Sequence, residues 1–176
     1  MKCSIHLQGH LQGAKKVSKQ IFQTSFAYHW HTNQTLLAKA FLLDEADYYA
    51  DPGGGQRSVH LTFFHLLTSH RGWRVALESG QQPAHLQAGD FPTREALQSA
   101  FMQEQEAWRS LLDRLTDQEI AGTITLTDLR GATREADYWR VLQHLILHGM
   151  QHHTELADML TRKGQSPGDI DFIFYG

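Results

Sequence analysis

The chain of 176 residues has one cysteine, Cys3, no long apolar run and no excess of basic residues. One cysteine cannot form an internal disulfide, so we expect a protein of the reducing cytoplasm. No stretch is apolar enough to cross a bilayer, and the first twenty residues lack the apolar core of a secretory signal. The net charge of -3 argues against nucleic acid as a partner. The expected partner is therefore a small molecule, with no role for membrane or nucleic acid.

The length suits one domain with a substantial core. No linker or internal repeat divides the chain. We expect residues 1–19 to form an N-terminal extension and residues 20–176 to form the folded domain. His6 and His10 lie in the extension, for which a metal-binding arm is the alternative interpretation.

Four segments have the spacing of apolar residues that is typical of helices. They are residues 20–43, residues 58 to about 80, residues 93–115 and residues 135–163. Pro52 and its three following glycines break the chain after the first segment, and Gly164 ends the last. The sequence GTITLTDLRGAT indicates either a short β-hairpin or an extended crossover before the last helix. The pattern predicts an all-α four-helix bundle with one long crossover.

Histidine is the compositional outlier, with 12 residues, four of them in LQHLILHGMQHHTEL. A helix turns about 100° per residue, so the faces of these residues can be compared. The apolar stripe of the last helix contains His152 and has His148 at its edge. His144 and His153 lie on the flanks, where roles beside a metal site or at the surface are expected. The pair at i and i+4 that best fits one buried ion is therefore His148 and His152.

A third ligand is expected from the second helical segment, where His65 has only small residues on its own face. These residues are Ser58, Thr62, Ser69, Gly72 and Ala76. They indicate a close helix approach or a hollow beside His65. His60 and His70 are each roughly 140° away from that face. The sequence therefore favours His65, His148 and His152 as ligands of one metal ion.

The other histidines fit a metal site less well. His29 and His31 lie about 200° apart on a helix, so they cannot share an ion, and we interpret them as surface or packing residues. His85 lies in a polar loop and is expected to be solvated. No general base can be named from the sequence. Glu155 is one candidate, and a glutamate that forms pairs on the helix surface is the alternative.

Four segments together resemble the DinB-like family of metal-binding four-helix bundles. FAYHWHTNQTLL resembles the first helix of the family, and GQSPGDIDFIFYG resembles its C-terminal segment. SVHLTFFHLLTSHRGW matches the second-helix motif through Ser58, His65 and Trp73. HLILHGMQHHTEL matches the motif in which the ligands are four residues apart, at His148 and His152.

The resemblance implies the same three histidine ligands, a divalent metal ion that is often zinc or nickel, and a homodimer. Members of known chemistry include transferases and isomerases that use low-molecular-weight thiols such as bacillithiol or mycothiol. The family often has Arg-Gly-Gln after its last ligand, where this chain has His153, Thr154 and Glu155. It often has Asn where this chain has Leu147, so substrate roles are not carried over.

Three functions fit the sequence. Three neutral imidazoles leave an ion with at least one open position, as in catalytic zinc sites, where a bound water reaches a pKa of about 7 or a thiolate is held for attack. The favoured hypothesis is a metal-dependent enzyme, either a thiol S-transferase or a hydrolase. The alternatives are a non-catalytic metal-binding or stress-response protein, and a dimeric bundle with structural histidines.

Overall fold

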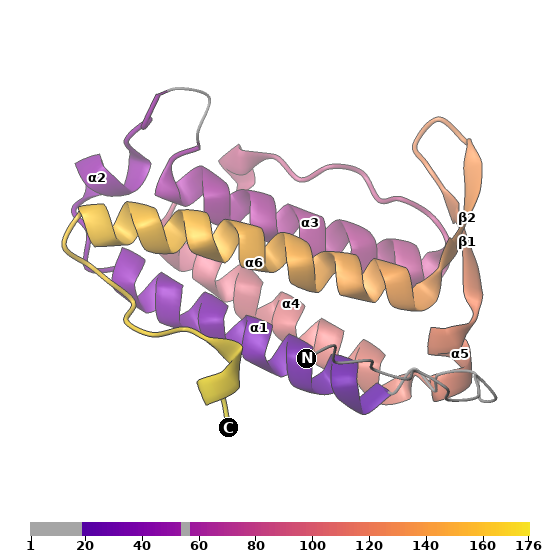
Figure 1. The fold of residues 1–176 in the computed structure, drawn as a ribbon. Coiled ribbons are helices and arrows are strands. Elements are labelled where there is room, and N and C mark those ends of the chain that lie inside the picture. The colour runs from indigo at the N-terminus through magenta and orange to yellow at the C-terminus, as the bar shows by residue number, and fades with distance from the viewer. Residues whose placement is uncertain (1–18, 54–56) are drawn as a thin grey trace, which may run out of the picture.

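Four long helices form a bundle in the computed structural model, which describes residues 19–53 and 57–176 (Figure 1). The predicted extension, with His6 and His10, lies outside the described residues apart from its last position. The long helices are α1 (Lys19–Ala40), α3 (Val59–Ser79), α4 (Arg94–Arg114) and α6 (Tyr138–Arg162). The short elements are α2 (Glu45–Tyr49), η1 (Ala88–Asp90), α5 (Asp117–Ala121), β1 (Thr123–Thr127), β2 (Thr133–Asp137) and η2 (Phe172–Phe174). The predicted all-α four-helix bundle is confirmed.

Each long helix packs against two others: α1 and α3 both contact α4 and α6. Helices α3 and α4 run in the same direction. Phe63 contacts Phe101 in the N-terminal halves of the two helices, and Glu78 pairs with Arg114 at their C-terminal ends. Parallel neighbours need a long connection, and residues 80–93 return along the outside of the bundle to supply it (Figure 1). We call this segment the crossover; the sequence predicted one long crossover but offered only residues 122–133 as a position for it.

Polar side chains define several of the helix ends. Ser58 precedes α3, and its hydroxyl accepts a hydrogen bond from the backbone N–H of Leu61 at 3.1 Å. Helix α1 ends at Ala40, three residues before the predicted position. There the Arg94 guanidinium donates to the carbonyl of Leu43 at 2.9 Å and so stabilises a different path for the chain.

The segment before the last helix forms a β-hairpin, one of its two predicted structures. Strands β1 and β2 are antiparallel, with Thr123 opposite Asp137 and Thr127 opposite Thr133. Asp128 organises the turn, because its Oδ1 accepts from the backbone N–H groups of Arg130 and Ala132. Pairing with β1 extends to residue 137, so α6 begins three residues later than predicted.

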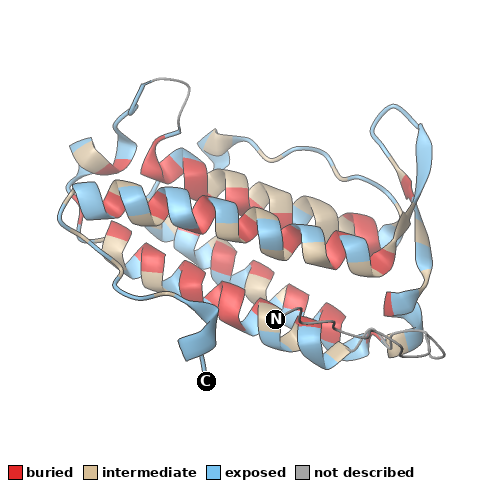
Figure 2. Cartoon of the chain, in the orientation of Figure 1, coloured by how far each residue is buried: buried red, intermediate tan, exposed pale blue. Residues whose placement is uncertain are grey.

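Aromatic side chains fill the centre of the bundle, where buried positions from all four long helices face inward (Figure 2). Trp108 is fully buried and stacks on Phe26 with ring centroids 4.7 Å apart. Burying such a ring removes about 150–250 Å² from water, which contributes roughly 4–6 kcal/mol. Arg74 and Glu104 form a well-shielded ion pair between α3 and α4, at 2.6 Å.

The C-terminal segment lies against α1. The Tyr28 hydroxyl donates to the carbonyl of Ile170, and the rings of Phe172 and Tyr175 contact Tyr28 edge-on. Ile173 and Phe174 nevertheless remain mostly exposed. No helix in the described part of the chain is long and apolar enough to cross a membrane.

Replacement of glycine by alanine should have opposite effects on the free energy of unfolding at two positions of α3 and its C-terminal cap. Gly80 caps α3 at φ 72°, and an added Cβ would lie 3.2 Å from the carbonyl oxygen of Thr125. Gly80→Ala should therefore lower the free energy of unfolding by about 1–2 kcal/mol. Gly72 lies inside α3 with open space around its Cβ position, so Gly72→Ala should raise it by about 0.5–1 kcal/mol. Urea unfolding measures both changes, and equal effects at the two sites would contradict the prediction.

Candidate metal centre

Three histidine side chains meet where α3 packs against α6. The Nε2 atom of His148 lies 3.1 Å from the Nε2 atoms of both His65 and His152. One ligand atom from each residue lies within 4.8 Å of the other two. In the described part of the chain, no other group of three histidine, cysteine or acidic residues satisfies this condition. The structure therefore brings together the three residues that the sequence selected.

Helix geometry explains this convergence. His148 and His152 are one turn apart on α6, so both imidazoles lie on the same face. Helix α3 runs antiparallel to α6, since His65 meets His148 while Trp73, two turns further along α3, contacts His144, one turn earlier on α6.

Glu155 fixes the orientation of one of the three rings. Its carboxylate accepts a hydrogen bond from Nδ1 of His152 at 2.7 Å. This bond holds the proton on Nδ1 and leaves the Nε2 lone pair directed toward the other two histidines. The Glu155 side chain is about half exposed, at 46%. It is thus attached to the site and is not a free surface group.

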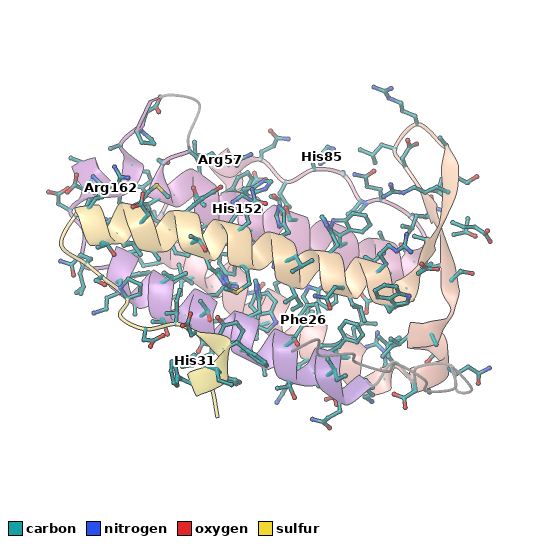
Figure 3. All side chains as sticks on the ribbon, in the orientation of Figure 1. Phe26, His31, Arg57, His85, His152 and Arg162 are labelled. Atoms are coloured by element: carbon teal, nitrogen blue, oxygen red, sulfur yellow. The ribbon has the colours of Figure 1, made fainter. Side chains whose placement is uncertain are left out.

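Burial and positive charge keep two of the rings neutral. Burial, together with the smaller effect of the nearby Arg57 charge, lowers the pKa of His65 to about 4. Burial, together with the smaller effect of the neighbouring His152, also lowers the pKa of His148 to about 4. Figure 3 shows Arg57 on the same side of the bundle as His152. Neutral imidazoles offer the lone pairs that a metal ion requires.

The donor set suits a small divalent ion. Nitrogen ligands bound to tetrahedral zinc at about 2.0–2.1 Å lie roughly 3.3–3.4 Å apart, close to the two separations of 3.1 Å between ring nitrogens here. Without a cation, the single Nε2 atom of His148 would have to form hydrogen bonds with the Nε2 atoms of both His65 and His152. Three nitrogens leave a tetrahedral ion with one open position.

A cavity of about 670 Å³ lies beside His65, between α3, the crossover and the hairpin. We call it the α3 cavity. His65, Ser69, Gly72 and Trp73 line it from α3, and Leu86 and Arg134 line it from the other side. A hollow beside His65 is one of the two structures that its small neighbours indicated, the other being a close helix approach. Ser58 and Thr62, two of those small residues, are buried instead.

A second set of histidines lies buried behind the three that converge. His29, His70 and His153 are each at most 1% exposed. The ring centroid of His29 lies 4.4 Å from that of His70 and 4.6 Å from that of His153. The Asn33 amide links two of these rings, because it donates to Nε2 of His29 at 2.9 Å and accepts from Nε2 of His153 at 3.0 Å.

These buried rings are also neutral. Burial lowers the pKa of His70 and His153 to about 3 and that of His29 well below its usual range. The rings lie face to face or tilted and are not arranged around a common point. We therefore interpret this set, with Asn33, as a polar part of the core.

The remaining candidate histidines do not join the cluster of three. His31 is exposed, and His60 is buried beside the Tyr48 hydroxyl. His144 is exposed and its ring contacts that of His148. His85 is exposed, as predicted, and lies on the crossover above the bundle at the α3 cavity (Figure 3).

Sequence comparison identifies the family to which this structure corresponds. The sequence model of the DinB family matches residues 15–176. The chain belongs to the DinB family. No curated protein sequence matches the chain.

Solved structures have the same fold at low sequence identity. YfiT from Bacillus subtilis, described as a probable metal-dependent hydrolase with an unusual four-helix bundle topology, is 13% identical with a TM-score of 0.66, covering 90% of this chain and 96% of its own. The DinB-like protein YjoA from Bacillus subtilis is 22% identical with a TM-score of 0.62, covering 84% and 93%. A DinB-like protein from Bacillus cereus is 14% identical with a TM-score of 0.64, covering 85% and 95%.

Sequence reasoning missed the buried histidine set. His29 lies seven residues after Phe22 and three after Phe26, on the apolar face of the first helix, and Asn33 follows it by one turn. That periodicity was the available signal for burial. Nothing in the spacing showed that His70 and His153 would lie against the same ring, because this contact depends on the packing of three helices.

The buried set predicts loss of stability in acid. The unfolded chain takes up a proton at His70 near pH 6.5, whereas the folded chain resists protonation until about pH 3. The free energy of unfolding is therefore highest above pH 6.5, where His70 is neutral in both states. It falls as the pH drops from 6.5 toward 3, because only the unfolded chain takes up the proton. Between pH 7 and pH 5 this one group should remove about 2 kcal/mol from the free energy of unfolding.

His70→Gln should therefore reduce the acid-induced loss by about 2 kcal/mol relative to the unsubstituted chain. Urea unfolding at pH 7 and pH 5 in the presence of chelator measures the difference without a contribution from metal binding. His31→Gln, at an exposed position, is the matched control. An unchanged pH dependence in His70→Gln would show that the proton uptake occurs elsewhere.

Proposed function

We propose that the chain is a metal-dependent enzyme, of the thiol S-transferase or hydrolase type, in which His65, His148 and His152 bind one divalent ion. The observation that carries this proposal is the convergence of three imidazoles, one of which, His65, lines the α3 cavity. A bound ion of this kind would supply a strong positive charge that activates a thiolate or a water molecule. Zinc or nickel, a thiol substrate and a homodimer stay predictions from the family resemblance.

The surrounding residues support this function in distinct ways. The Glu155 carboxylate keeps the His152 ring oriented and raises its basicity as a ligand. The guanidinium of Arg57 acts on His65 and His148 through its positive charge. The same charge would stabilise a negative group, such as a thiolate, that approaches the three histidines from outside. The description of YfiT as a probable metal-dependent hydrolase agrees with this proposal.

Metal removal should destabilise the chain if the three histidines hold an ion. A chelator should lower the melting temperature, because a ligand at a thousandfold excess over its dissociation constant stabilises the folded state by about 4 kcal/mol. The shift should fade as the pH falls toward about 4, where His65 and His148 of the folded, metal-free chain take up protons and no longer offer their lone pairs. Differential scanning calorimetry on untagged protein measures it. An identical melting curve with and without chelator at pH 7.5 would count against the site.

Glu155→Gln should weaken metal binding by about 10–100-fold without unfolding the chain, because the His152 ring loses a charged partner. Competition with a chromophoric chelator gives the affinity. Glu106→Gln is the matched control, since Glu106 pairs only with Arg109 among the described residues, on the exposed face of α4. Equal metal affinities in the two variants would show that Glu155 does not support metal binding.

Catalysis should depend on the loaded site. Metal-loaded protein should conjugate a thiol to an electrophile such as 1-chloro-2,4-dinitrobenzene, and His148→Ala should lose at least a hundredfold in kcat/KM, whereas His31→Ala should not. The absorbance of the conjugate, followed with each of several thiols in turn, measures the rate. Metal binding without turnover of any thiol or ester would support the non-catalytic metal-binding alternative. Absence of bound metal would support the other alternative, a dimeric bundle with structural histidines.

A further inference from the structure

We propose that the far end of the α3 cavity is a carboxylate-binding subsite, in which Arg134, held over Trp73, and Arg71 select an anionic substrate. This inference rests on the proposed function, because it places the reactive end of the substrate at His65. It adds the chemical class of the distal group and the residues that determine specificity for it.

The dimensions of the cavity call for a ligand with two separate ends. Lining residues on α3 run from His65 to Ala76, and eleven residues of helix span about 16 Å. The volume of about 670 Å³ falls in the usual range for small-molecule sites. A ligand that reaches the three histidines therefore leaves its other end beside the hairpin. An extended tripeptide, at roughly 10 Å of backbone plus side chains, is of suitable size.

The hairpin presents a held cation at that end. The guanidinium carbon of Arg134 on β2 lies 5.6 Å from the ring centroid of Trp73 on α3. A cation–π contact of this kind restricts the side chain and does not use its N–H groups, which stay available to a ligand. A planar fork of this kind matches the two oxygens of a carboxylate.

The charges that line the cavity favour an anion. Arg71 and Arg134 both line it, and neither forms an ion pair with another residue in the described ranges 19–53 and 57–176. Asp128 is the acidic residue on the wall, and its Oδ1 already accepts two backbone hydrogen bonds in the hairpin turn. The two arginines therefore outweigh a single carboxylate that is engaged in the turn.

The test compares three probes on the zinc-loaded full chain by isothermal titration calorimetry. Glutathione carries a thiol and two carboxylates, its diethyl ester carries the thiol without free carboxylates, and S-methylglutathione carries the carboxylates without a free thiol. The subsite predicts that glutathione binds at least tenfold more tightly than the diethyl ester, because a charge-assisted hydrogen bond contributes about this much.

Arg134→Gln and Arg71→Gln should each reduce this ratio to threefold or less. Arg130→Gln should preserve it, since Arg130 is exposed on the same hairpin and does not line the cavity. Equal binding of glutathione and its diethyl ester would overturn the subsite. The subsite would also be overturned if both arginine variants kept the full preference for glutathione over its diethyl ester, or if no probe bound.

The same probes distinguish failure of the subsite from failure of the metal centre. A carboxylate preference that persists in chelated protein, with S-methylglutathione binding as tightly as glutathione, would support the subsite and contradict the metal-bound thiol. Tight, metal-dependent binding of both thiols with no carboxylate preference would support the metal centre and overturn the subsite.

A cavity-filling variant tests whether the probes bind in the α3 cavity at all. An added Cβ at Gly72 meets no atom within 4 Å, so Gly72→Leu should fill the middle of the cavity without disturbing the helix. It should weaken glutathione binding at least tenfold, whereas Gly72→Ala should change it by less than threefold. Unaltered affinity in Gly72→Leu, at a melting temperature no lower than that of the unsubstituted chain, would place the ligand elsewhere and overturn the proposal.

Discussion

The antiparallel packing of α3 against α6 is the contact on which the rest of the site depends. It sets the Nε2 atom of His65 against that of His148, which also faces His152 one turn away. Burial at the same contact keeps the pKa of His65 and His148 near 4, so these rings are neutral at physiological pH. Packing, protonation and ligand geometry therefore have one common cause. A shift of one helix along the other by a single turn, about 5.4 Å, would remove all three.

The polar interior behind this contact constrains the same helices. Gly149 on α6 lies against the imidazole of His29, and a Cβ there would approach the ring to 2.3 Å. The missing side chain lets α1 and α6 come close enough for the His29 ring to stack on His153, with the Asn33 amide between their nitrogens. Burying three neutral imidazoles costs free energy unless their nitrogens are paired. Asn33 offsets part of that cost, and it fixes the relative rotation of α1 and α6.

The sequence was sufficient for those features that depend on a single helix. The 3.6-residue period gave the four long helices, Ser58 marked the start of α3, and the i and i+4 spacing placed His148 and His152 on one face. Features that depend on contacts between helices were less accessible. Arg94 from α4 determines where the chain leaves α1, and pairing with β1 delays the start of α6. The interior set around His29 requires three helices to be in place, so periodicity alone did not reveal it.

The departures from the family motif become intelligible in these terms. Where the family often has Arg-Gly-Gln after the last ligand, this chain has His153, Thr154 and Glu155. His153 points into the core, where a neutral ring can be buried and a guanidinium, which stays charged, could not be buried without a partner. The Thr154 hydroxyl donates to the backbone carbonyl of Met150. Glu155 places a carboxylate on His152, and its negative charge, close to the three imidazoles, favours a cation among them. The residues of the motif have thus changed, and Glu155, three positions after His152, is the one that contacts the histidine cluster.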